Sequence, residues 1–148
     1  MTETETLLDA EQIEMALDGV GLPWTRRESA WAVTPPDGVG RELLVSRKDG
    51  LVVDAVLVEW DEASTESLAA LKVFLERAAA STCGVRCSID GTQARILAEV
   101  SDDEIESGLP RAIQAVSAGC RFLAREARAL LEADLARQYL AFHSPVHL

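Results

Sequence analysis

Hydrophobic positions recur with two different periods along this chain, and the period predicts strands in some segments and helices in others. The longest apolar run, Leu51 to Trp60, is rich in β-branched residues, and both its odd and its even positions are largely apolar. A strand that is apolar on both faces is typical of the interior of a sheet rather than of an exposed edge. We therefore expect residues 51–60 to form a central strand whose two faces are both covered.

Two further strands are predicted before this central strand. Residues 24–34 and 41–48 have the composition of strands, and Pro35-Pro-Asp-Gly38 between them predicts a loop. Lys48-Asp-Gly50 predicts a tight turn that leads into the central strand. Because the connections are short, we expect the three strands to form an antiparallel meander.

A hairpin is predicted in the second half of the chain. Apolar and polar residues alternate in residues 85–89 and again in residues 94–100, on either side of Asp90-Gly91. Two alternating segments joined by Asp-Gly are a strong hairpin signal. The meander and the hairpin together predict a five-stranded antiparallel sheet.

Two helices are predicted from apolar positions at helical spacing. The first covers residues 9–18 and ends at a pair of glycines, which are followed by a proline. The second begins within residues 61–67, a cluster of residue types that favour helix starts, and ends near Ser81. Helices this short are rarely stable alone, so their apolar sides should pack on the sheet.

The third helix is predicted near the C-terminus. Ser101 and Glu104 have the spacing of a capping box, which indicates a helix start. Because Gly108 and Pro110 follow closely, we expect the helix to be interrupted after a brief first turn. A long helix from Pro110 to Tyr139 should then complete the chain's regular structure.

The predicted order of elements is α-β-β-β-α-β-β-α, which implies an α+β fold with helices packed on an antiparallel sheet. A chain of 148 residues is long enough for one domain with its own core, and we assign residues 9–140 to it. Residues 1–8 are expected to be a disordered tail, because they begin with alternating threonine and glutamate. Residues 141–148 are expected to be a flexible tail.

Three stretches resemble a known fold family. The segment Leu68–Arg77 resembles the helix that follows the third strand in class I type III secretion chaperones and YbjN-like proteins. Ile89–Thr92 followed by Arg95–Val100 resembles the later strand pair of that family. The acidic stretch Ser101–Glu104 before a long helix resembles its closing segment. The resemblance covers roughly residues 8–140 and lies in the order of elements, without an invariant motif.

This resemblance implies a protein that is not an enzyme. Members of the family are homodimers that bind protein segments, often an extended stretch of a secreted or regulated partner. Exposed strand edges can take up such a stretch by adding it to the sheet. The resemblance carries no residue-level binding motif over to this chain, so it leaves the identity of the partner open.

The chain is acidic, with 25 aspartates and glutamates against 14 lysines and arginines and a net charge of −11. An average field of this sign disfavours binding to nucleic acid or to anionic membranes. It suits a second hypothesis, an acidic inhibitor or immunity-type protein that masks a basic partner. Residues 1–22 contain no basic residue and so lack the start of a secretory signal, which leads us to expect a cytoplasmic protein.

Candidate metal ligands and nucleophiles are few. Cys83 and Cys87 are one residue too far apart for a redox Cys-x-x-Cys pair, and a zinc site would need Cys120, His143 or His147 as further ligands. Reduced cysteines are expected in a chain without an export signal. We therefore predict no catalytic site, no metal and no cofactor.

Four apolar residues are candidates for a partner or dimer surface. They are Trp24, Trp31, Trp60 and Leu44. Tryptophan is enriched at the centres of protein interfaces. Packing in the core is the alternative for the tryptophans, because this residue type is largely buried on average.

Overall fold

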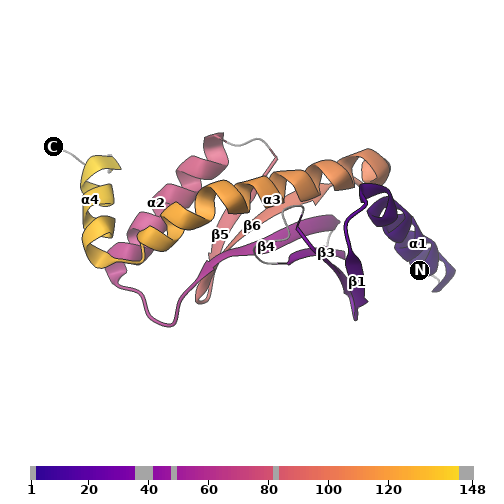
Figure 1. Ribbon diagram of the computed structural model, residues 1–148, viewed down its shortest axis with the longest axis horizontal. Coiled ribbons are helices and arrows are strands. Elements are labelled where there is room, and N and C mark those ends of the chain that lie inside the picture. Colours follow the sequence, from indigo (N-terminus) through magenta and orange to yellow (C-terminus); the bar gives the residue numbers. More distant parts are fainter. Residues whose placement is uncertain (1–2, 36–41, 48–49, 82–83, 144–148) are drawn as a thin grey trace. The chain divides into compact units, whose positions relative to one another are not determined.

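A computed structural model describes residues 3–35, 42–47, 50–81 and 84–143 (Figure 1). The elements follow one another along the chain as α1 (Glu3–Val20), β1 (Trp24–Arg27), β2 (Ala30–Val33), β3 (Leu43–Arg47), β4 (Leu51–Glu59), α2 (Thr65–Ser81), β5 (Arg86–Asp90), β6 (Gln93–Val100), the 3-10 turn η1 (Asp102–Glu104), α3 (Ile105–Ala129) and α4 (Ala133–His143). This mixture of helices and strands confirms the α+β class.

The strands form one sheet in the order β1-β2-β3-β4-β6-β5. The pairs β1–β2, β2–β3 and β3–β4 are antiparallel. The backbone N–H of Trp60, just after β4, donates to the carbonyl of Thr92, just before β6, at 3.0 Å. The end of β4 thus meets the start of β6, as an antiparallel pair requires. With β3 on one side and β6 on the other, β4 is the central strand that its two apolar faces predicted.

The sheet has six strands, so the prediction of five is wrong. Residues 24–34 do not form one strand, because Glu28 and Ser29 make a turn between β1 and β2. Arg27 pairs with Ala30 across this turn, and Trp24 pairs with Val33 at the other end. A two-residue turn between antiparallel strands is the shortest common hairpin connection. It escaped prediction because the turn contains neither glycine nor proline.

The first helix is longer than predicted. It begins at Glu3, so from that residue on, the segment expected to be a disordered tail is helical. At the other end of the chain, α4 reaches His143, and residues 144–148 lie outside the described part of the structure.

The prediction of a single long helix over residues 110–139 is also wrong. Helix α3 begins at Ile105 and continues through Gly108 and Pro110. A Cβ atom on Gly108 would lie 3.1 Å from Val100 Cγ1, so this glycine permits a close approach between helix and strand and does not end the helix. The helix stops instead at Ala129, and α4 follows after three residues.

Hydrogen bonds between residues three apart, instead of four, account for the end of α3. The N–H of Leu131 donates to the carbonyl of Arg128 and that of Glu132 to the carbonyl of Ala129, each at 3.1 Å. Bonds between residues three apart tighten the last turn and end the regular i to i+4 pattern. The N–H of Ala136 then donates to the carbonyl of Glu132 at 2.9 Å and begins the new helix.

The chain divides into two compact units. The first contains residues 1–55 and 97–117, and the second contains residues 56–96 and 118–148. Each has a buried apolar centre: in the first, Ile13, Leu17, Leu43, Val45 and Val53, and in the second, Ala70, Leu71, Leu75, Ala94 and Ile96. Strands β4 and β6 and helix α3 each contribute to both units. The assignment of residues 9–140 to one domain stays a prediction.

Candidate functional site

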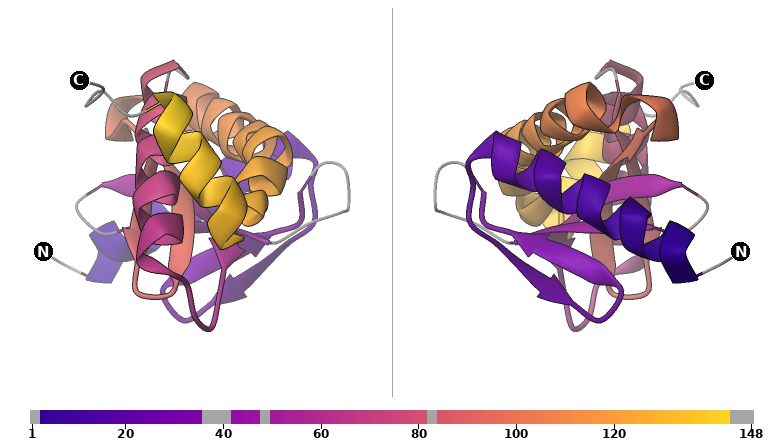
Figure 2. Two further views of the ribbon diagram at one scale, coloured as in Figure 1. Left: turned by 90° about the vertical axis from the view of Figure 1, so that its left-hand side faces the viewer. Right: turned by 90° about the vertical axis from the view of Figure 1, so that its right-hand side faces the viewer.

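Trp24 and Trp31, two of the predicted surface residues, attach α1 to the first hairpin. The indole N–H of Trp31 donates to Glu14 Oε2 at 2.9 Å, and that of Trp24 donates to Asp18 Oδ1 at 2.9 Å. Glu14 and Asp18 are four residues apart on α1, so they lie on the same side of the helix. Figure 2 (right) shows α1 beside the strands that follow it.

Trp31 is the more buried of the two, with 6% of its surface exposed. The guanidinium of Arg26 lies 5.9 Å from the centre of its ring and makes a 3.5 Å ion pair with Glu14. Glu14 therefore holds both the indole and the arginine that covers it. This placement agrees with packing in the core, the alternative considered for the tryptophans.

Leu44 and Trp60 lie elsewhere. Leu44 pairs with Ala32 and Asp54, on the face of the sheet opposite to Trp31, and it is half-buried. Trp60 is also half-buried, but it follows β4 in the second unit. Within the first unit, the structure thus brings Trp24 and Trp31 to one face and leaves Leu44 on the other.

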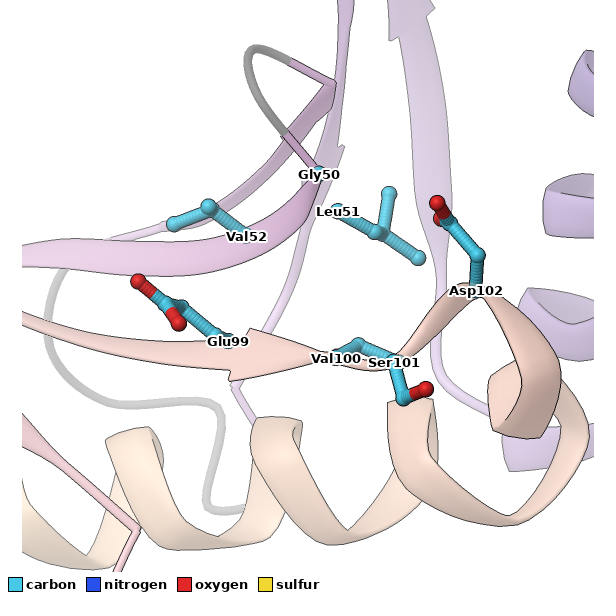
Figure 3. Close-up of a pocket in the computed structure, with 7 residues that line it drawn as sticks. All are labelled: Gly50, Leu51, Val52, Glu99, Val100, Ser101 and Asp102. Atoms are coloured by element: carbon cyan, nitrogen blue, oxygen red, sulfur yellow. The ribbon is translucent and has the colours of Figure 1, made fainter.

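A first hollow lies at the start of β4. Its volume is about 610 Å³, and Figure 3 shows Gly50–Val52 on one side and Glu99–Asp102 on the other. The carboxylate of Asp102 accepts from Arg47 Nη1 at 2.5 Å, and the hydroxyl of Ser101 accepts from the N–H of Asp103 at 3.4 Å. Asp102 and Ser101 therefore serve local structure, an ion pair and a helix cap.

A second hollow, which we call the α4 groove, lies within the second unit between α2, the end of α3 and α4. Its volume is about 360 Å³, and it is lined by Phe74, Glu126, Ala129, Leu130, Leu135, Gln138, Tyr139, Phe142 and His143. Figure 2 (left) shows α4, in yellow, lying beside α2. The lining is mostly aromatic and aliphatic, as is typical of sites that bind apolar groups.

The sequence of α4 explains why the groove is open. Ala136 is fully buried, while Leu135, Tyr139 and Phe142 recur at i, i+4 and i+7 and so form a separate ridge. This ridge is poorly covered: 38% of Leu135 and 81% of Phe142 are exposed. Large exposed apolar side chains in a cluster often mark an interaction site.

Aromatic rings form a connected group along the groove. The ring of Tyr139 lies 6.2 Å from that of Phe74 in an edge-on arrangement and 4.3 Å from that of His143. The Phe142 ring lies 4.9 Å from the same histidine. Burial raises the pKa of Tyr139, an effect that nearby Arg77 opposes, so its hydroxyl is neutral at physiological pH and can donate a hydrogen bond.

Sequence analysis did not find this groove. Residues 110–139 were predicted to form one uninterrupted helix, and His143 was assigned to a flexible tail. A single helix has no surface between two helices, so no groove was expected there. The available signal was the helical spacing of Leu135, Tyr139 and Phe142 near the end of the predicted helix and just beyond it. The break before α4, which turns this spacing into one wall of a groove, has no glycine or proline to announce it.

The cysteines show no arrangement for chemistry in the part of the chain that the structure describes. Cys87 and Cys120 are half-buried, and burial raises the pKa of the Cys87 thiol, which makes it a poor nucleophile at neutral pH. Cys83 and His147 lie outside the described residues. Among the residues that are described, no three histidine, cysteine or acidic side chains gather as a metal site would require.

The length and hydropathy of the helices decide whether any of them could span a membrane. Within the described ranges, none of them combines the length and the apolar character that crossing a bilayer would require.

Comparison with known proteins identifies a similar fold. The sequence matches no protein-family model and no curated protein. Among solved structures, it is similar to the crystal structure of YbjN from E. coli, for which a role as a transcription regulator has been suggested, with a TM-score of 0.56. The alignment covers 81% of this chain and 91% of that chain at 16% identity. The chain therefore has a YbjN-like fold, as the resemblance of its sequence implied.

Proposed function

We propose that this chain is a protein-interaction module, without enzymatic activity, that binds a segment of a partner protein in the α4 groove. The exposed ridge of Leu135 and Phe142 beside an apolar hollow is the observation that carries the proposal. A chaperone-like role, in which the groove shields an apolar segment of the partner from water, is the form of this function that the resemblance of the sequence to class I type III secretion chaperones implies.

The occupant that fits the groove is an amphipathic helix with apolar anchors. Side chains spaced along one helical face can insert into a groove formed by other helices. Burying one leucine or phenylalanine contributes about 1.5–3 kcal/mol, so two anchors contribute about 3–6 kcal/mol. Further contacts along the groove are needed to offset the cost of association. The Tyr139 hydroxyl and the His143 ring supply polar groups at the edge of the groove.

Replacing Phe142 with aspartate should weaken binding of the partner segment by about tenfold or more, because aromatic residues at interface centres commonly contribute 2 kcal/mol or more. Partners captured from the native host with the wild-type chain would be expressed as segments and titrated by calorimetry. Met15→Asp is the matched control, since Met15 is 71% exposed and lies on α1, which contributes no residue to the lining of the groove. Equal affinities for wild type and Phe142→Asp would contradict the proposal.

We further propose that the chain forms a homodimer through the second face of the sheet in the first unit. Leu44 and Val52 are half-buried there, and Ala32, also on this face, is almost fully buried. An isologous interface needs one self-complementary patch, and here it would be centred on Ala32, Leu44 and Val52, with Asp54 beside Leu44.

Light scattering after size exclusion should give twice the chain mass of 16.0 kDa at micromolar concentration. Leu44→Asp should yield a monomer, because two carboxylates would meet at the dimer axis without partners. Met15→Asp is the control that should remain a dimer, because Met15 is exposed on α1, which packs against the other face of the sheet through Trp24 and Trp31. A monomeric wild-type protein would overturn the dimer and leave the groove proposal standing.

The net charge of −11 favours a second candidate, an acidic inhibitor that masks a basic partner. Salt dependence separates the two functions. Masking by charge weakens steeply as ionic strength rises, whereas burial of apolar anchors in the α4 groove does not.

A further inference from the structure

Helix α3 carries an unusual row of positive charge in an acidic protein. Arg121, Arg125 and Arg128 recur at i, i+4 and i+7, so they lie on one side of the helix, and all three are exposed. We call this row the arginine stripe. Of the residues that line the α4 groove, Glu126 and Ala129 belong to α3, and neither is part of this row.

The charges of the stripe are not balanced by their surroundings. Among the described residues, no ion pair involves any of the three arginines, and the only charged groups three or four residues from Arg125 are the other two. Like charges at this spacing destabilise a helix by about 0.2–0.5 kcal/mol per pair. The chain has 25 acidic residues but places none at i±3 or i±4 of Arg121 or Arg125.

The helix dipole does not account for the whole stripe. Arg128 lies in the last turn of α3, where a positive charge is favourable. Arg121 lies more than two turns before the end of the helix at Ala129, beyond the reach of this effect. A partner that neutralises the row explains all three positions together.

We propose that the arginine stripe is a docking surface for an acidic segment of a partner protein. Guanidinium groups bind carboxylates through paired hydrogen bonds, and a row with this spacing along α3 can meet two or three carboxylates on an adjacent helix or strand. This site is independent of the α4 groove and of the function proposed for it.

Phe122 adds an apolar anchor beside the stripe. It is 73% exposed, and the guanidinium of Arg121 lies 5.5 Å from the centre of its ring. The contact holds Arg121 over the ring and limits the conformations that binding would have to fix. The preferred segment therefore combines carboxylates with one leucine or aromatic residue.

The charge of the whole chain favours a protein segment over nucleic acid. A duplex carries one negative charge per roughly 1.7 Å and would bring many phosphates into the field of a protein with a net charge of −11. A short segment with few carboxylates interacts mainly with the arginine stripe, because charges more than about 8–10 Å away are screened at physiological salt.

The test uses the full-length protein and a fluorescein-labelled peptide that contains three glutamates at helical spacing and one leucine. Fluorescence anisotropy should show saturable binding that weakens as salt is raised. The same peptide with glutamines in place of the glutamates should bind much more weakly, because it lacks the carboxylates that the arginines would pair with. In the double variant Arg121→Glu/Arg125→Glu, the affinity should fall by at least about tenfold, because two attractive contacts become repulsive.

Arg111→Glu is the matched control, since Arg111 is exposed on the same helix but outside the stripe, and its variant should bind like the wild type. Circular dichroism confirms that each variant is folded. Equal binding by the double variant, or binding to a DNA duplex in preference to the acidic peptide, would overturn the proposal. The proposal would also be overturned if the wild type self-associates, the double variant does not, and neither binds the peptide. The occupant of the stripe would then be a second copy of this chain.

Discussion

Trp31→Ala should lower the free energy of unfolding by about 3–5 kcal/mol, as truncation of a buried tryptophan usually does. The side chain is 6% exposed, and its strand pairs with β3 at Val45, which is fully buried. Removing the indole also removes the donor to Glu14 Oε2 and leaves a partly buried carboxylate with one hydrogen bond fewer. The effect should appear as a lower midpoint of urea unfolding.

Two further variants test this role of Trp31. Trp31→Phe keeps most of the packing and loses the donor, so it should cost about 1–2 kcal/mol. Trp60→Ala removes a half-buried tryptophan in the second unit and should cost clearly less than Trp31→Ala. Equal losses for the two alanine variants would contradict the role of Trp31 in docking α1.

The tryptophans show how far sequence can separate core from surface. The alternation of apolar and polar residues correctly placed Trp31 on a strand. It could not show which face of the sheet α1 would cover. That choice depends on Glu14 and Asp18, which are distant in sequence and look like ordinary surface carboxylates on a helix. Only the folded arrangement shows that these two residues receive the indole donors.

Elements whose position depends on the local sequence pattern were predicted well. Elements whose boundaries depend on packing were not. The central strand and the Asp90-Gly91 hairpin follow from alternation and turn chemistry, and both are present. The turn at Glu28-Ser29 and the break before α4 contain no turn-forming glycine or proline, so they escaped detection. The α4 groove depends on that break, which is why the candidate site could not be predicted.

Gly108 was misread as an interruption for a related reason, and Gly119 in the same helix shows what a helical glycine can do. A glycine in a helix costs about 1 kcal/mol relative to alanine, so sequence analysis treats it as a breaker. In this structure Gly119 is buried where α3 approaches Ile96 of β6 within the second unit. A Cβ atom at this position would collide with the Cδ1 atom of Ile96, which is itself fully buried. An alanine at this position would therefore need either the Ile96 side chain or the helix to shift.

Gly119→Ala should consequently destabilise the protein by about 1–3 kcal/mol, despite the gain in helix propensity. Ile96→Val removes the Cδ1 methyl group that the new Cβ would meet, and alone it should cost about 0.5–1.5 kcal/mol. If the collision is the cause, the double variant should be little worse than Ile96→Val, which gives a coupling energy of about 1 kcal/mol or more. Urea unfolding of the four proteins measures this cycle. Losses that add within about 0.5 kcal/mol would show that Ile96 can turn aside and that the glycine has another role.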